Sequence, residues 1–256
     1  MSRMQGPAAV VVDDLTARTA HANRLIDDEP LRARGASGAT HRLERLCTAL
    51  TRALPASGVG LSLLTDENRG GGTVTASDSK SRLLEELQFT LGEGPCIDAY
   101  AARRPVLEPD LGTHGMRRWP GYARAAHEHG VRAVFAFPLQ VGAARAGALD
   151  VYRAEPGSLT ADALTQAVTF ADIAMGLLVD GQARVGDRRA SPQVDDALAN
   201  RLEVYQAQGM VMVDLGVGIE EAMARLRAHA WAEGRSIGDV AQEIVAGKLT
   251  LDRDSP

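Results

Sequence analysis

The second half of the chain carries a repeating pattern of apolar positions that is typical of amphipathic helices. One stripe, whose members are three or four positions apart, comprises Leu198, Leu202, Tyr205, Gly209 and Met212. That spacing places the whole stripe on one face of a helix. The pattern ends soon after Met212, where Gly216 and Gly218 favour a turn.

Two further apolar stripes follow this turn. They comprise Ile219, Ala222, Met223, Leu226 and Ala230, and then Ile237, Val240, Ala241, Ile244 and Val245. Gly234 separates them, and Ser236 with Asp239 forms a capping-box pattern that opens the last helix. The three stripes predict a compact unit of three short helices joined by tight turns.

Helical and strand-like patterns alternate between residues 40 and 182. Strands are predicted where β-prone residues run together, at 59–65, 73–76, 105–107, 131–141 and 146–152. Helices are predicted at 43–54, 81–90, 95–103, 119–129 and 160–182. This order predicts an α+β fold, with helices around an antiparallel sheet.

The segments that flank this region are less regular. We interpret residues 1–38 as an N-terminal arm, in which residues 13–26 can form a helix, and residues 185–194 as a polar linker. A second heptad-like stripe comprises Leu164, Val168, Ala171, Met175 and Leu178. Either this stripe or the one at 198–212 could bury a face against a second copy, so we expect a homodimer. The alternative for 164–178 is to cover the sheet of its own domain.

The composition is that of an ordinary globular protein, with 45% hydrophobic and 24% charged residues. No apolar stretch is long enough to predict a membrane span, and the first residues lack a signal-peptide pattern. Cys47 and Cys96 alone cannot build a disulfide framework. We therefore expect a cytoplasmic protein with free thiols and no membrane partner.

Charge gives no general sign of nucleic-acid binding. The formal net charge is −5, and residues 195–256 contain six Lys and Arg against eleven Asp and Glu. Any RNA binding must therefore depend on a local basic patch or on paired subunits.

The C-terminal helices carry motifs that resemble the ANTAR domain family. The carrying segments are Ala207-Gln-Gly-Met-Val-Met212, Glu220-Glu-Ala222, Leu226-Arg227 and Arg235-Ser-Ile237. The resemblance implies an all-α, three-helix domain at 195–250, followed by a tail at 251–256, that binds hairpin loops in nascent transcripts and modulates transcription termination. The candidate RNA-binding residues are Gln208, Arg227, Arg235 and Ser236. Gln208 replaces a Lys that is usual in the family, so one phosphate-attracting charge is missing.

Residues 39–184 resemble a GAF domain, a sensor fold with an antiparallel sheet flanked by helices. The carrying segments are Gly92-Glu-Gly-Pro-Cys96, residues 131–139, Gly147-Ala-Leu149 and the helix at 164–178. The resemblance implies a small-molecule ligand, whose identity no residue set selects. The candidate pocket residues are Cys96, Trp119 and Tyr122. Cys96 is either a redox or ligand-sensing thiol or a small buried hydrophobe, and the two aromatic residues could equally be core.

No catalytic set and no metal site emerges from the sequence. His127 and His129 are two positions apart, so they face different ways on a helix. We therefore predict a non-enzymatic regulator in which a GAF-like sensor controls an RNA-binding ANTAR-like domain. The alternative is a protein-interaction regulator with a ligand-binding GAF domain and no RNA binding, and a third hypothesis is an enzyme built on the GAF-like pocket.

Overall fold

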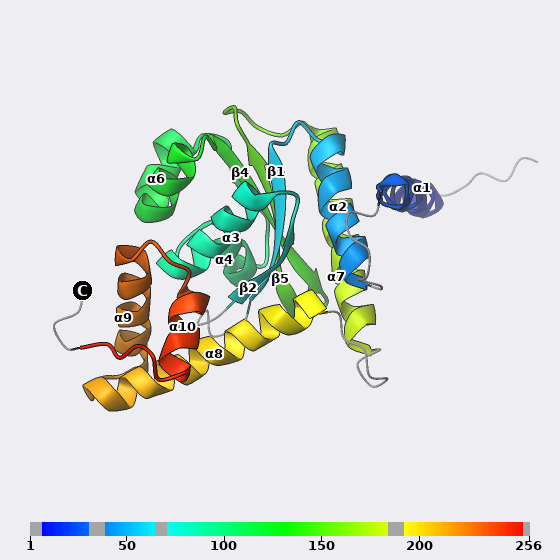
Figure 1. Cartoon of the computed structure of the whole chain (residues 1–256). Coiled ribbons are helices and arrows are strands. Elements are labelled where there is room, and N and C mark those ends of the chain that lie inside the picture. Colours follow the sequence, from blue (N-terminus) through cyan, green and yellow to red (C-terminus); the bar gives the residue numbers. More distant parts are fainter. Residues whose placement is uncertain (1–6, 31–38, 65–70, 184–191, 253–256) are drawn as a thin grey trace, which may run out of the picture.

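The computed structural model describes residues 7–30, 39–64, 71–183 and 192–252. Its centre is a five-stranded antiparallel sheet, formed by β1 (Gly58–Leu64), β2 (Gly71–Ala76), β3 (Val106–Glu108), β4 (Ala133–Val141) and β5 (Ala144–Arg153). The strand order is β2-β1-β5-β4-β3, with β1–β2 and β4–β5 as neighbouring pairs in sequence (Figure 1). The α+β fold with an antiparallel sheet and flanking helices is therefore confirmed.

Alternation along the strands divides the sheet into two faces. Leu149 and Val151 of β5 belong to a core with α2 (Ala39–Ala53) and α7 (Ala161–Ala183). The other face, with Ala148, Asp150 and Tyr152, is covered by α3 (Ser79–Leu91), α4 (Pro95–Ala102) and α6 (Pro120–Glu128). A π-helical turn, η1 (Leu111–Gly115), and a short α5 (Met116–Arg118) lead into α6.

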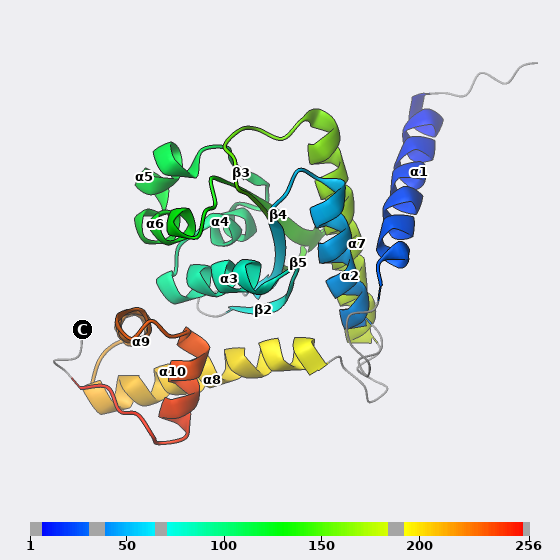
Figure 2. The same ribbon diagram turned by 45° about the horizontal axis from the view of Figure 1, so that its top comes forward.

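The N-terminal segment contains a helix longer than expected. Helix α1 (Pro7–Asp28) has 22 residues and runs beside α7 and α2 (Figure 2). Ala22 and Ile26 are buried in the same core as α2 and α7. The described part of the segment at 1–38, which we interpreted as an arm with a possible helix, is therefore a helix that contributes to the core.

Helix α7 tests two expectations from the sequence, which concern a membrane span and the role of the apolar stripe at 164–178. Its segment Ala161–Asp180 is long and apolar enough to cross a membrane by composition alone, contrary to the sequence interpretation. However, its side chains at 167, 170 and 174 are fully buried in the core, as expected for the core helix of a folded domain. Of the heptad-like stripe, Ala171, Met175 and Leu178 also face this core, so most of it covers its own sheet.

The C-terminal unit consists of α8 (Pro192–Leu215), α9 (Ile219–Ala232) and α10 (Ile237–Val245). The all-helical three-helix expectation is confirmed, although α8, with 24 residues, is not short. Its core-facing residues are Val204, Ala207, Val211 and Leu215. Of the expected stripe, Met212 packs against this core, whereas Leu202 is 62% exposed.

The C-terminal helices contact the sheet domain at two places. Helix α8 passes along β2, which is an edge strand, and α9 and α10 meet α3 (Figures 1 and 2). Phe89 of α3 packs against the core of the helical unit and also against the cluster that contains Cys96. A single side chain therefore links the two cores.

Candidate functional site

Arg227 lies on the face of α9 that meets the sheet domain. An added Cβ at Gly92 would come within 2.5 Å of Arg227 Nη1, so the guanidinium is in close contact with the end of α3. Gly92 has φ +69° and caps α3, a conformation that disfavours side chains. Burial lowers the pKa of Arg227, which is half-buried although it is charged. The residue predicted to contact RNA is thus partly covered by the neighbouring domain.

Arg235 and Ser236 occupy the turn between α9 and α10. Arg235 Nη2 lies 2.8 Å from Glu243 Oε1, and Nη1 donates to Glu243 Oε2 at 3.0 Å, so the pair is bidentate. The Arg235 side chain is still 31% exposed. Ser236 is the N-cap of α10, where its Oγ accepts a hydrogen bond from Asp239 N at 3.1 Å. Both residues stay reachable by a ligand, although each already has a structural role.

Gln208 has different surroundings from the other three candidate RNA residues. Only 2% of it is exposed, and its Nε2 donates to the Ile219 carbonyl at 2.6 Å. This bond joins α8 to the start of α9. The amide that stands at the family's Lys position therefore stabilises the helix pair, and it is not presented at the surface.

Trp231, near the end of α9, was missed by the sequence analysis. It is 49% exposed, which is unusual for the largest apolar side chain. Gly234 N bonds to the Trp231 carbonyl, so the ring belongs to the same turn as Arg235. An exposed aromatic ring provides a surface on which a base could stack.

The three residues expected to line a pocket are all buried: Cys96 is 0%, Trp119 2% and Tyr122 0% exposed. Trp119 Nε1 donates to Asp98 at 3.1 Å. Glu93 Oε1 accepts hydrogen bonds from the backbone N–H groups of Gly121 and Tyr122, and so caps α6. The loop at 92–96 therefore holds α6 against α3 and α4.

A cluster of buried polar side chains lies under this loop, against the second face of the sheet. Glu85 accepts hydrogen bonds from Ser62 Oγ and from the Tyr152 hydroxyl, both at 2.5 Å. Gln88 Nε2 donates to Asp150 Oδ2 at 2.6 Å, while its Oε1 accepts from Cys96 N at 2.9 Å. The cluster joins β1, β5, α3 and α4, and it was not predicted from the sequence.

Burial dominates the electrostatics of this cluster. It raises the pKa of Glu85 to about 7, against the opposing hydrogen bonds from Ser62 and Tyr152. Burial, followed by the nearby Glu85 charge, raises the pKa of Asp150. The pKa of Cys96 is also raised by burial and then by Asp150, so this thiol is not the thiolate that a fast redox sensor needs.

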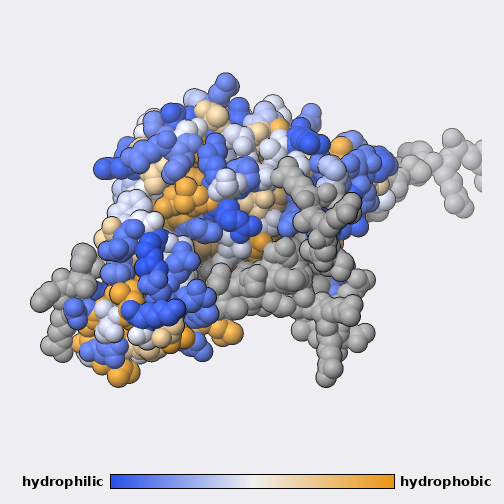
Figure 3. All heavy atoms as spheres, viewed as in Figure 1, coloured by the Kyte–Doolittle hydropathy of each residue, from blue (hydrophilic) through white to orange (hydrophobic). Residues whose placement is uncertain are grey.

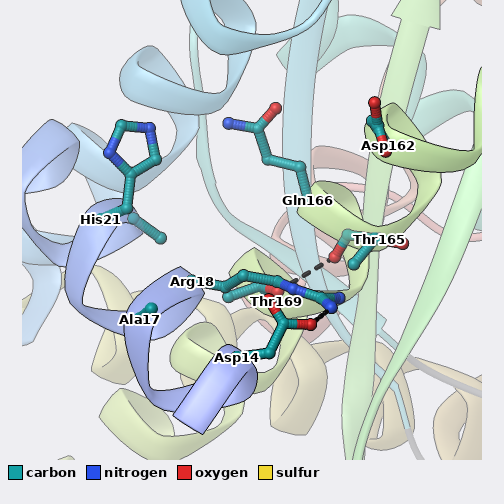
Figure 4. Close-up of a pocket in the computed structure, with 9 residues that line it drawn as sticks. Asp14, Ala17, Arg18, His21, Asp162, Thr165, Gln166 and Thr169 are labelled. Carbon is teal, nitrogen blue, oxygen red and sulfur yellow. Dashed lines mark hydrogen bonds and ion pairs between the residues drawn. The ribbon is translucent and has the colours of Figure 1, made fainter. Parts of the chain in front are cut away.

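A cleft of about 540 Å³ lies elsewhere, between α1 and α7 (Figure 4). Its polar walls comprise Asp14, Arg18, His21, Asp162, Thr165, Gln166 and Thr169. Arg18 forms an ion pair with Asp14 inside the cleft, so its charge is already balanced. His21 and Asp162 are the remaining ionisable side chains on its walls.

The outer face of α8 exposes large apolar side chains. Val213 is 81%, Leu202 62% and Met210 37% exposed. Figure 3 shows apolar atoms gathered at the C-terminal end of this helix. Such a grouping is typical of a surface that contacts another molecule.

The two halves of the chain each match a known domain family. The profile of the GAF domain matches residues 39–178, and that of the ANTAR domain matches residues 193–245. A comparison with curated proteins gave no match.

One solved structure supports the fold of the first unit, and others are similar to it to a lesser degree. The GAF domain of a phosphoenolpyruvate-protein phosphotransferase from Coxiella burnetii has a TM-score of 0.50 at 15% identity, over 67% of this chain and 96% of that one. A homologous domain from Acinetobacter gives 0.49 at 14% identity, over 73% and 99%. Free methionine-R-sulfoxide reductase from Neisseria meningitidis gives 0.44 at 16% identity, over 70% and 94%. At these identities the similarity concerns the fold alone.

The GAF match covers more than half of the chain, and the helices α8 to α10 coincide with the ANTAR match. The chain therefore belongs to the GAF domain family and carries a C-terminal ANTAR domain.

Proposed function

We propose that this protein is a transcription regulator in which the GAF domain controls RNA binding by the ANTAR domain. A sensor domain joined to an ANTAR domain supports regulation in general terms. The observation that carries the specific proposal is the contact of Arg227 with Gly92, which places a candidate RNA-binding cation against the sensor. RNA that needs this guanidinium must compete with the GAF domain for it.

The docked arrangement is stabilised by apolar contact and opposed by charge. Phe89 packs into the ANTAR core, which favours docking. Burial raises the pKa of Glu86 on α3; Arg82 opposes this shift, and the nearby Asp239 of α10 adds to it. The repulsion between the Glu86 and Asp239 carboxylates opposes docking.

The proposed RNA surface comprises Arg227, Arg235, Ser236 and Trp231. Arginine binds phosphate or guanine bidentately, and an exposed indole stacks on an unpaired base. Hairpin loops in nascent transcripts present such unpaired bases. Because Gln208 is buried, we assign it to the stability of the domain and not to this surface.

The assembly we propose is a homodimer that pairs through the outer face of α8. The exposed Leu202, Met210 and Val213 support this choice over α7, whose apolar stripe is largely used within its own domain. Two ANTAR domains in one dimer would present two RNA surfaces, which raises the effective concentration for paired hairpins. We place this dimer in the cytoplasm, where nascent transcripts occur.

The test is the affinity of the full chain for a two-hairpin RNA at low salt. Phe89→Ala should loosen docking and tighten RNA binding several-fold, whereas Arg227→Ala should weaken it at least ten-fold. The control for Phe89→Ala is Leu83→Ala, which lies on the exposed side of α3. The control for the loss of charge is Arg225→Ala, which lies two positions from Arg227 and is paired with Glu221. Equal effects of Arg225→Ala and Arg227→Ala would remove Arg227 from the site.

One alternative function has a specific observation in its favour. The ANTAR region carries an excess of acidic residues and an exposed apolar face on α8, both of which suit a protein partner. If neither the wild-type protein nor Phe89→Ala binds RNA at low salt, the result would support the protein-interaction role instead. We propose no enzymatic role, since a buried Cys96 with a raised pKa is a poor nucleophile.

A further inference from the structure

Three side chains from distant parts of the sequence bring potential metal ligands together inside the GAF domain. The ligand atoms of Glu85 on α3, Cys96 on α4 and Asp150 on β5 all lie within 4.8 Å of one another. All three residues are 0% exposed. Two carboxyl groups and a thiol in one dry site are costly unless something compensates them.

The hydrogen bonds within the protein leave this cluster incomplete. Among the described residues, Asp150 Oδ1 and the Tyr122 hydroxyl are buried atoms without a hydrogen-bond partner. Tyr122 is 0% exposed, and after burial its pKa responds to Asp150, Glu85, Cys96 and the hydroxyl of Tyr152, so its own hydroxyl lies beside the cluster. A buried carboxyl oxygen and a buried hydroxyl without hydrogen bonds are both unusual, so a ligand that engages them would stabilise the cluster.

We propose that Glu85, Cys96 and Asp150 bind a divalent first-row transition-metal ion. A cation placed between them would engage Asp150 Oδ1 and offset both carboxylates. The fourth position would fall to a water or to the Tyr122 hydroxyl. This inference does not depend on whether the protein binds RNA.

The surroundings resemble the outer shell that orients metal ligands. Ser62 and Tyr152 fix the Glu85 carboxylate, and Gln88 fixes Asp150 through one oxygen while leaving the other available. Such second-shell hydrogen bonds set the direction of ligand atoms before the ion arrives. An added Cβ at Gly60 would come within 2.1 Å of Glu85 Oε1, so this glycine provides the space for the carboxylate.

Cys96 is also well placed to ligate as a thiolate. It is the second residue of α4, after Pro95, where the helix dipole favours negative charge. Binding would form a metal–sulfur bond and break the S–H bond, and the proton would leave to water. The site would then hold three negative ligands and a 2+ ion, and its residual charge would be offset by the donors Ser62, Tyr152 and Gln88.

The ligand types select the class of metal. Mg²⁺ and Ca²⁺ prefer sites built only from oxygen, whereas a thiolate with carboxylates suits Zn²⁺ or Fe²⁺. Zinc bonds of about 2.0–2.3 Å place neighbouring ligand atoms about 3.5 Å apart. Because the ligand atoms are now up to 4.8 Å apart, the cluster would have to contract by at most about 1.3 Å to reach that geometry.

The test uses the full-length protein refolded from guanidinium with Co²⁺ as the probe, so that slow entry into a buried site cannot hide binding. We expect one Co²⁺ per chain and a thiolate-to-cobalt absorption band in the near ultraviolet. Mg²⁺ in thousand-fold excess should leave the band unchanged, whereas Zn²⁺ should abolish it by displacement. Absence of the band in folded wild-type protein would overturn the proposal.

Matched variants separate the site from general effects on folding. Cys96→Ala should abolish the band, while Cys47→Ala, which removes the other buried cysteine in the opposite core, should keep it. Asp150→Asn and Glu85→Gln keep side-chain shape and should each weaken Co²⁺ binding at least ten-fold. Circular dichroism identifies the variants that fold. A folded Cys96→Ala protein that retains the band, or a Cys47→Ala protein that loses it, would disprove the assignment.

Discussion

Small residues decide where the polar groups of the GAF core can lie. Gly60 pairs with Asp150 across β1 and β5, and it faces Glu85. A side chain at this position would displace a carboxylate that is fixed by two hydrogen bonds. The absence of a Cβ at one strand position therefore permits the whole buried cluster.

Gly60→Ala should destabilise the protein by about 1–3 kcal/mol, because the added methyl would lie 2.1 Å from the buried Glu85 Oε1. Gly176→Ala in α7 is the control, since nothing lies within 4 Å of its added Cβ. That change should be neutral or should stabilise by about 0.5–1 kcal/mol. Denaturant midpoints measure both, and similar values for the two variants would contradict the packing argument.

Both thiols should resist alkylation in the native protein. Cys47 and Cys96 are fully buried, and burial raises the pKa of each, so the reactive thiolate is scarce and shielded. Iodoacetamide at pH 8, in the presence of a chelator, should label no cysteine within minutes and both cysteines after unfolding. Fast native labelling of Cys96 would restore the interpretation of this residue as a redox sensor.

At the scale of elements, helices with similar apolar stripes have different roles. The stripe on α7 is largely buried in its own domain, whereas that on α8 contacts the ANTAR core through Met212 and exposes Leu202. Both have intervals of four and three residues. The difference arises from the elements against which each helix packs. The spacing of apolar residues along the helix does not specify these elements.

Substitutions on the two helices should therefore separate folding from assembly. Leu178→Glu places a charge in the GAF core and should cost at least about 3 kcal/mol of stability. Val213→Glu, at a residue that is 81% exposed, should leave stability within about 0.5 kcal/mol and weaken the proposed dimer. Sedimentation and thermal unfolding measure the two effects. A dimer that survives Val213→Glu together with Leu202→Glu would exclude this face of α8.

At the scale of the molecule, α3 connects the buried cluster to the ANTAR domain. Glu85 and Gln88 of this helix bond into the cluster, while Phe89 reaches the helical core and Glu86 approaches Asp239. Because interiors are close-packed, a shift of α3 would be transmitted to both sides. This geometry provides a direct route from a change in the sensor to a change at Arg227.

RNA binding should depend only weakly on salt. The domain is acidic, and the proposed surface offers about two cations, which gives a slope of about −1.4 in a plot of log affinity against log salt. Arg227→Ala should reduce that slope by about 0.7. A steep wild-type slope would indicate that other basic residues carry the contact.

The fold class and most of the elements follow from local patterns in the sequence. Periods of two and of about 3.6 residues are local properties, and glycines such as Gly216 and Gly234 end helices without help from distant residues. The motifs at 207–212, 220–222 and 235–237 were also sufficient to identify the ANTAR domain, because they are contiguous and ordered.

Contacts between residues that are distant in sequence depend on how the elements pack in three dimensions. Glu85, Cys96 and Asp150 are separated by 11 and 54 positions, and they converge because α3 and α4 cover one face of β5. An aspartate between Leu149 and Val151 was a visible signal, since apolar strands seldom bury a carboxyl group without a partner. The burial of Gln208 and the contact of Arg227 with Gly92 likewise depend on how helices pack, and no local pattern encodes that.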